Sequence, residues 1–323
     1  MRAIFDRWPG SNSALAEAVP DEHALHSFLA LISHLNSDLA WTLPLEELSS
    51  YTNSNPQCIA KVRAFYDHHP SYFCPDDVVR LLFDLKFAVK RQYISRAIGG
   101  RFFPASVDLG CGIGDCLPLL SAHSALAIGI DVSQRALAIA PYVLNLKHSR
   151  AHLMAADAAR LPLRTGSMDL IVCSELLEHL YDDTVCLVEI LRVLRRGGVL
   201  IGTVPSGSRL SDADLFWGHF RRYEMTALCS LLVKRGFSID TLGSFGFPME
   251  RIVWPRLRRL FSHLANSRRK DRLPDAYSNE SALLCSSLYL NRLSGLVDLA
   301  VHVDRAFGRY RGPRTIIFEA TKR

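Results

Sequence analysis

The chain has 323 residues, of which 49% are hydrophobic, so it is long enough to bury a substantial core in one large or two modest domains. The net charge of +6 does not by itself indicate nucleic acid as a partner, because the excess is concentrated in one segment, residues 251–272. No apolar run approaches the roughly 18 residues of a spanning helix, no secretory signal is evident at the start, and the eight cysteines form no C-x-x-C pair. We expect a cytoplasmic protein with reduced thiols, without a zinc ribbon or a disulfide framework.

The first hundred residues show helical periodicity and few strand signals. Apolar residues recur at helical spacing along 24–35 and along 76–98, where a pair of glycines follows as a typical helix end. The second stretch has a broad apolar face and also carries Lys90 and Arg91. We expect residues 1–100 to form a helical lead-in.

The sequence pattern changes between residues 105 and 206, where short β-rich runs alternate with helical stretches. This alternation predicts βαβ units, and therefore a parallel sheet with helices on both faces and ligands at the carboxyl ends of its strands. The expected strands are ASVDLG, ALAIGIDVS, AHLMAAD, MDLIVCS and GVLIGTVPS, and the expected helices lie at about residues 115–123, 133–147 and 183–195.

A glycine-rich loop follows the first of these strands in VDLGCGIGDC, residues 107–116. Its G-x-G-x-G spacing differs from the G-x-G-x-x-G of dinucleotide-binding folds. Asp108 and Asp115 flank the loop and would repel a pyrophosphate, so a ligand with a positive charge fits better. Asp131 and Asp157 end the next two strands, where each could bind a nucleoside ligand or could only cap the following helix.

The order of these motifs resembles that of class I S-adenosylmethionine-dependent methyltransferases, in the branch that acts mostly on small molecules and lipids. VDLGCGIGD is similar to the family's glycine motif, IGIDVS to its ribose-binding strand, AADAARLPLRTGSMDLIVCSELLEHL to its adenine-side and fourth-strand motifs, and EILRVLRRGGVLIGTVPS to its fifth strand. The resemblance covers about residues 107–206, and residues 218–239 resemble the segment that usually follows. It implies an α/β fold with a doubly wound, mostly parallel, seven-stranded Rossmann-like sheet, and S-adenosyl-L-methionine as the cofactor.

The resemblance also implies which residues bind the cofactor. The loop glycines would line its methionine end, Asp108 would balance its amino group, Asp131 would hold the ribose, and Ser174 would lie near the sulfonium. Asp157 and Ala158 would flank the adenine. The full implied set is Asp108, Gly110, Cys111, Gly112, Gly114, Asp131, Val132, Asp157, Ala158 and Ser174.

A sulfonium is already an activated methyl donor, so the protein has chiefly to align the acceptor and exclude water. A hydroxyl acceptor would also need help to lose its proton, whereas an amine or a thiolate needs less. The candidate bases are Glu175, Glu178, His179, His219 and Tyr223. His219 is favoured, because WGHFRRYE places dense polar groups just after the fifth strand; His179 could instead shape the cofactor site, and Tyr223 could only fix the loop.

Other histidines give no recognisable metal pattern. The pair His68 and His69, and His148 with His152, have no nearby carboxylate or thiol at a ligand spacing, so we interpret them as surface residues. The sequence therefore predicts no metal site.

The last predicted strand, residues 314–322, follows the sixth, residues 238–245, only after almost seventy residues. The inserted segment begins with the basic amphipathic stretch 251–272, which could lie on an anionic membrane but is interpreted first as a helix packed on its own domain. Residues 281–309 are apolar enough to form a helical cap. The expected division is a lead-in over 1–100, a cofactor-binding core over 101–245, a basic helical insertion or cap over 246–312, and the core's final strand over 313–323.

The resemblance thus implies a methyltransferase that acts on a small-molecule, sugar or lipid-linked acceptor, with oxygen as the favoured acceptor atom, and we expect no nucleic acid partner. Two other classes stay open. One is a catalytically silent scaffold that keeps the cofactor fold, and the other, disfavoured by the glycine spacing, is an NAD-dependent oxidoreductase.

Overall fold

The computed structural model describes residues 64, 66–67, 85–246, 256, 294–307 and 315–323. The basic stretch 251–272, apart from Arg256, lies outside these residues, as do His68 and His69. The elements within the described residues are α4 (Leu85–Ile98), β1 (Phe103–Leu109), α5 (Leu117–Ala122), β2 (Ser124–Asp131), α6 (Gln134–Leu146), β3 (His152–Ala155), β4 (Met168–Ser174), the 3₁₀ helix η3 (Leu177–His179), α7 (Asp183–Val193), β5 (Leu194–Pro205), α8 (Asp212–Phe216), α9 (Met225–Lys234), β6 (Phe237–Phe245), α12 (Ser294–Phe307) and β7 (Thr315–Lys322).

The seven strands form one sheet in the order β3-β2-β1-β4-β5-β7-β6. The first five strands are parallel, while β7 runs antiparallel to both β5 and β6. The predicted doubly wound, mostly parallel sheet is therefore confirmed. The strand order reverses between β1 and β4, and such a switch point is where open α/β sheets bind their ligands.

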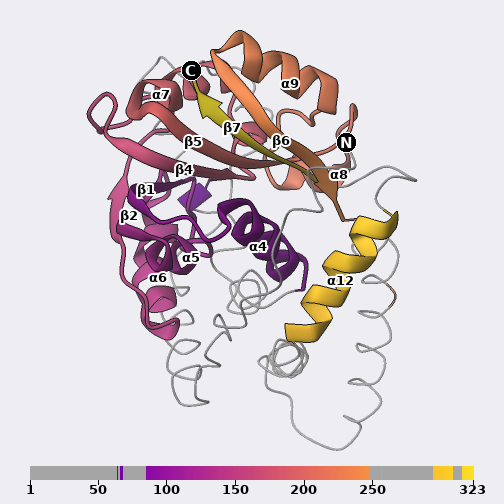
Figure 1. Ribbon diagram of the computed structural model, residues 1–323, viewed down its shortest axis with the longest axis horizontal. Helices are drawn as coiled ribbons and strands as arrows, with labels where there is room; N and C mark the ends of the chain where they lie inside the picture. The colour runs from indigo at the N-terminus through magenta and orange to yellow at the C-terminus, as the bar shows by residue number, and fades with distance from the viewer. Residues whose placement is uncertain (1–63, 65, 68–84, 247–255, 257–293, 308–314) are drawn as a thin grey trace, which may run out of the picture.

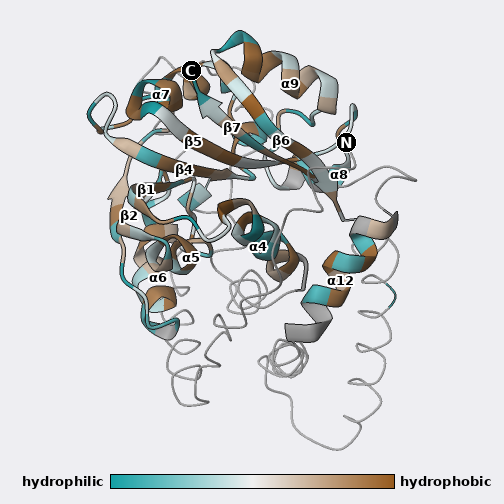
Figure 2. Ribbon diagram, viewed as in Figure 1, coloured by the Kyte–Doolittle hydropathy of each residue, from teal (hydrophilic) through white to brown (hydrophobic). Residues whose placement is uncertain are grey.

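Helices cover both faces of the sheet (Figure 1). One core packs α7 and α9 on the sheet through side chains such as Ile190 and Leu232. The other core packs α4, α5 and α12 on the opposite face through side chains such as Ile94, Leu120 and Val301. Figure 2 shows hydrophobic residues along the central strands, and both hydrophobic and hydrophilic residues on the helices. No helix within the described ranges is long and apolar enough to cross a membrane.

Local signals explain several helix starts. Ser133 begins α6 by accepting a hydrogen bond from the Ala136 amide, and Asp182 begins α7 by accepting one from the Thr184 amide. One boundary differs from the sequence prediction: β5 begins at Leu194, before the expected strand GVLIGTVPS and within the helix expected at about 183–195, and the side chains of Arg195 and Arg196 are exposed.

The chain returns to the sheet through α12 and β7. Asp298 of α12 accepts hydrogen bonds of 3.2 Å from Gln92 and from Arg96, both on α4. Gly202 of β5 lies opposite Phe318 of β7, and a Cβ at Gly202 would come within 2.2 Å of the Phe318 ring. After the insertion, β7 thus returns the chain to the core, where it lies between β5 and β6 and packs tightly on β5.

Candidate active site

The loop after β1 requires glycine at its first position. Gly110 has a φ of +74°, and its amide donates to the Ile130 carbonyl at 2.8 Å. A Cβ at this position would lie 2.9 Å from a methyl carbon of Leu176, in the loop after β4. Gly112 and Gly114 also have positive φ values. The glycines therefore let the loops after β1 and β4 meet at the switch point.

Asp131 at the end of β2 anchors this loop. One carboxylate oxygen accepts from the Gly112 amide at 2.7 Å, and the other accepts from the Ser133 amide at 2.8 Å. Burial raises the pKa of Asp131, against the lowering effect of these backbone hydrogen bonds. Each carboxylate oxygen can accept more than one hydrogen bond, so Asp131 keeps capacity for the two hydroxyls of a ribose.

A residue of the lead-in reaches the same place. Asp67 accepts a hydrogen bond of 2.7 Å from the Ser133 hydroxyl and one of 2.9 Å from the Arg135 amide, at the first turn of α6. Asp131 accepts from the Ser133 amide, so both aspartates bond the residues that begin this helix. The sequence analysis missed Asp67, because only folding brings residue 67 beside residue 133.

Four charged groups gather beside the glycine loop. Asp108 is 3% exposed, and burial together with the neighbouring charge of Asp115 raises its pKa to about 7, while Lys90 acts in the opposite direction. Arg91 pairs with one oxygen of Asp115 at 2.5 Å. Burial lowers the pKa of Lys90, but nearby groups including Asp115 outweigh that effect and raise it overall. Lys90 and Arg91, which sequence reasoning treated only as part of a helix face, therefore belong to this site.

The other predicted cofactor residues are spread along the same edge of the sheet. Asp157 follows β3 and accepts from the Ala159 amide at 2.9 Å, and burial raises its pKa. Ala158 and Cys111 are buried, and Val132 lies just past β2. The Ser174 hydroxyl at the end of β4 lies 2.9 Å from the hydroxyl of Thr203 on β5.

Glu175 follows Ser174 in a left-handed conformation, with a φ of 53°. This conformation is uncommon outside glycine, and here two bonds to one residue hold it: the Glu175 amide donates to the Thr203 carbonyl, and the Thr203 hydroxyl donates to the Glu175 carboxylate at 3.0 Å. Glu175 is thereby fixed close enough for its charge to act on both Lys90 and His219.

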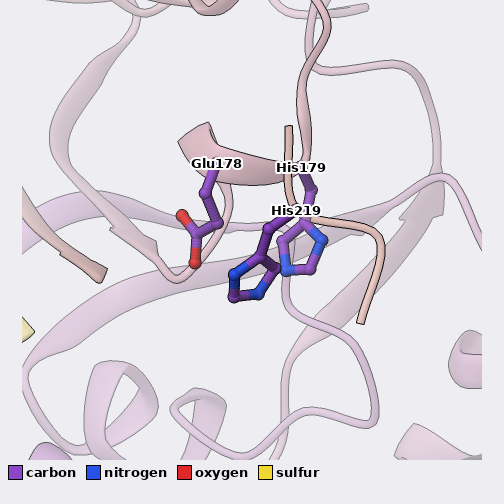
Figure 3. Close-up of side chains that lie close together, drawn as sticks. All are labelled: Glu178, His179 and His219. Atoms are coloured by element: carbon purple, nitrogen blue, oxygen red, sulfur yellow. The ribbon is translucent and has the colours of Figure 1, made fainter. Parts of the chain in front are cut away.

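The predicted catalytic residues His179 and His219 come together at the carboxyl ends of β4 and β5. Their rings stand edge to face with centroids 4.6 Å apart. Glu178 is the neighbour of His179 on η3, and Figure 3 shows its carboxylate turned toward the two rings. Ligand atoms of Glu178, His179 and His219 all lie within 4.8 Å of one another.

Each histidine ring has a hydrogen-bond partner at Nδ1. The Tyr66 hydroxyl lies 3.0 Å from Nδ1 of His179, and an Asp214 carboxylate oxygen lies 3.0 Å from Nδ1 of His219. Asp214 is itself buried and accepts two hydrogen bonds of 2.8 Å from Arg222. Burial acts to raise the pKa of Asp214, but the bonds from Arg222 and Ser211 outweigh it and hold that pKa well below its usual range.

Because Asp214 stays ionised, it can only accept, and the Nδ1 of His219 is the donor. Burial lowers the pKa of His219, against the opposite influence of Asp214. The ring is therefore neutral near pH 7, with its lone pair on Nε2. The sequence carried a signal for this pair, since Asp214 precedes His219 by five residues in DLFWGH.

Tyr223 makes its contacts in a different place from the two histidines. Its hydroxyl donates to Asp183 at 2.6 Å, and the ring is buried in the core beneath α7 and α9. Burial and the charge of Asp183 raise the pKa of Tyr223, which makes the phenol a poor base at neutral pH. Arg221 also pairs with Asp183, at 3.0 Å. The structure thus gives Tyr223 a contact that fixes the loop to α7.

Comparisons with known proteins point to the same class of protein as the motifs at the strand ends. Residues 107–202 match the family model described as a methyltransferase domain. The chain carries a class I S-adenosylmethionine-dependent methyltransferase domain. Over 143 residues it is 32% identical to a probable S-adenosylmethionine-dependent methyltransferase of Mycolicibacterium smegmatis, a match that covers 43% of this chain and 54% of that protein.

The methyltransferase domain has a more distant relative in the ubiquinone biosynthesis O-methyltransferase of Nitrosomonas europaea, with 26% identity over 45% of this chain and 61% of the relative. The chain therefore spans little more than half the length of the curated relatives it matches. A solved structure, phosphoethanolamine N-methyltransferase 2 of Haemonchus contortus, shares the fold with a TM-score of 0.55 and 18% identity, covering 81% of this chain and 60% of that one.

The residues at the loop after β1 fit the cofactor of this family. Among the described residues nothing donates a hydrogen bond to the second oxygen of Asp115, although that oxygen is buried. Asp108 is buried beside it, and two close carboxylates favour a positively charged ligand. S-adenosylmethionine carries an ammonium and a sulfonium for these acids, a carboxylate that suits Lys90 or Arg91, and a ribose diol that suits Asp131.

Proposed function

We propose that the protein transfers a methyl group from S-adenosylmethionine to a hydroxyl oxygen of a small-molecule, sugar or lipid-linked acceptor. The observation that carries the choice of oxygen is the pairing of His219 with the ionised Asp214 at the carboxyl end of the sheet. A hydroxyl is a poor nucleophile until its proton leaves, whereas a neutral amine needs no such assistance before attack.

In this proposal the ends of β1, β2 and β3 hold the cofactor. Asp131 holds the ribose, Asp157 and Ala158 flank the adenine, and Asp108 and Asp115 face the ammonium, with Lys90 and Arg91 at the carboxylate. When bound, S-adenosylmethionine supplies a methyl group activated by its sulfonium, which the acceptor oxygen takes as the carbon–sulfur bond breaks and its electron pair stays on sulfur.

The ends of β4 and β5 serve the acceptor. Asp214 fixes the His219 ring and its tautomer, so the Nε2 lone pair is available without reorganisation. That lone pair can assist the loss of the hydroxyl proton, either by taking it or by holding a cation that acidifies the hydroxyl. Glu175 lies close enough to stabilise positive charge that develops there.

The names of relatives support oxygen as the acceptor atom. Besides the ubiquinone biosynthesis enzyme, a malonyl-[acyl-carrier protein] O-methyltransferase of Marinomonas is 34% identical over 113 residues. Both relatives are named for methyl transfer to oxygen.

Two substitutions test the division between the cofactor side and the acceptor side. Asp131→Ala should weaken S-adenosylmethionine binding more than about tenfold, because both ribose hydroxyls lose a charged acceptor. His219→Ala should keep cofactor affinity and lower turnover by about a hundredfold or more on hydroxyl acceptors. Calorimetry gives the first quantity, and release of S-adenosylhomocysteine with a panel of hydroxyl compounds gives the second.

Matched controls are the exposed residues Asp212 and His152, whose alanine variants should behave as the wild type. Unchanged cofactor affinity in Asp131→Ala would remove the ribose assignment. Transfer to amines that proceeds equally in wild type and His219→Ala, with no transfer to hydroxyls, would refute the choice of oxygen.

A further inference from the structure

The cluster of Glu178, His179 and His219 has the composition of a metal site. It offers one carboxylate and two imidazoles, with ligand atoms within 4.8 Å of one another. Ligands of a divalent transition metal lie about 2.0–2.2 Å from the ion, so two ligand atoms of a tetrahedral site are about 3.4 Å apart. A small inward movement of the side chains would therefore seat one ion between them.

The positions of these three residues are set by the backbone. The Phe220 amide donates to the Glu178 carbonyl at 2.7 Å, which joins the segment that carries His219 to η3. The His219 amide donates to the Asp214 carbonyl at 2.9 Å. Glu178 is fully buried, and His219 is 12% exposed at its side chain. The cluster is thus built into the fold and is not a chance meeting of surface side chains.

The bonding of His219 matches what metal-binding histidines need. Such histidines almost always bond through their other ring nitrogen to a carboxylate, carbonyl or water, which fixes the ring and its tautomer. Here Asp214 holds Nδ1 of His219 and Tyr66 lies at Nδ1 of His179, both at 3.0 Å. Arg222 and Ser211 in turn hold Asp214. This leaves Nε2 of His219 as the atom to coordinate.

We infer that Glu178, His179 and His219 bind one divalent transition-metal cation, and that the acceptor hydroxyl binds to it beside the methyl donor. This inference rests on the proposed function and departs from the sequence expectation of no metal. Three protein ligands leave at least one position open for an oxygen atom. A hydroxyl on such an ion loses its proton to water near neutral pH, and its oxygen then becomes the nucleophile.

The donor set also selects the metal. Imidazole nitrogens suit Zn²⁺ and Co²⁺ better than Mg²⁺, which prefers oxygen ligands in octahedral geometry. The negative charge of Glu175 acts on His219 and adds to the attraction for a cation without being one of the three ligands. We therefore expect Co²⁺ and Zn²⁺ to bind more tightly than Mg²⁺.

The test uses the full chain after dialysis against a chelator, with no cofactor or acceptor present. Titration with Co²⁺ should give visible d–d absorption that saturates at one ion per chain, and Zn²⁺ should displace it. Glu178→Gln, His179→Ala and His219→Ala should each abolish the band, while the control His152→Ala keeps it. Asp214→Asn, which retains all three ligands, should weaken Co²⁺ binding by about 10- to 100-fold.

S-adenosylmethionine titration of each metal-free variant shows whether it is folded and separates this inference from the proposed function. Variants that bind the cofactor but not Co²⁺ support the site. Wild type that binds the cofactor yet gives no saturable Co²⁺ band overturns it, and so does a band that survives in His219→Ala. Full turnover of the wild type in chelator would also overturn the metal's part in the reaction, while leaving O-methyl transfer intact.

Discussion

Asp108 is a buried carboxyl group at the end of β1, and its ionisation makes stability depend on pH. Its folded pKa of about 7 lies above the ordinary value of 3.8, because burial, Asp115 and Asp131 outweigh the effect of Lys90. The folded state therefore keeps a proton that the unfolded chain releases. The stability from this group is complete below pH 3.8 and is lost as the pH rises through about 7.

The variant Asp108→Asn removes this ionisation, so its free energy of unfolding should increase relative to that of the wild type between pH 5 and pH 8. The expected growth in the difference between the two free energies of unfolding is on the order of a few kcal/mol. Urea unfolding of both proteins across this pH range measures it. A difference that stays constant with pH would show that Asp108 has an ordinary pKa.

A site residue could be predicted where the local sequence pattern fixes its place in the fold. The glycines, Asp131 and Ser174 sit at the ends of apolar strands, so pattern alone places them at one edge of a parallel sheet. Tyr66, Asp67 and Lys90 reach that edge from the lead-in, and helical periodicity says nothing of which strand end a helix meets. The short distance from Asp214 to His219 in sequence was readable, but not that Asp214 would be buried and ionised.

Among the elements, β5 and β7 show how closely the sheet is packed. Gly202 faces Phe318 across the antiparallel pair, where a Cβ would lie 2.2 Å from the ring. Gly202→Ala should therefore destabilise the protein by about 1–3 kcal/mol, because the buried ring has to move. The cost should be smaller when Phe318 is also replaced by Leu, and a double-mutant cycle on urea unfolding measures this coupling.

Gly100→Ala is the matched control, because a Cβ there meets nothing within 4 Å. Its expected effect is within about 0.5 kcal/mol. Equal costs at Gly202 in both backgrounds would contradict the register of β5 and β7.

The elements of the core were predictable because their patterns are local. Buried parallel strands appear in the sequence as apolar runs, and Ser133 marks the start of α6 as its N-cap. The 3₁₀ helix η3 and the extension of β5 to Leu194 were not predicted. Both depend on partners far along the chain: β5 starts where Leu194 pairs with Met168, and η3 is tied to Phe220.

For the whole molecule, the sheet separates two tasks along one edge. The ends of β1, β2 and β3 carry acids and glycines suited to a nucleoside with positive charge, while the ends of β4 and β5 carry the histidines and Glu178. The helices α4 and α12 pack on the face where Lys90 and Arg91 reach the first group. A segment that precedes the core and one within the insertion are therefore both part of the support for the site.

The central claim is that the strand ends bind S-adenosylmethionine, and calorimetric titration tests it without knowledge of the acceptor. The purified protein is titrated in parallel with S-adenosylmethionine, S-adenosylhomocysteine and NAD. We predict one saturable site for each of the first two ligands and no heat of binding for NAD. Saturable binding of NAD, or no binding of either sulfur-containing ligand, would contradict the claim.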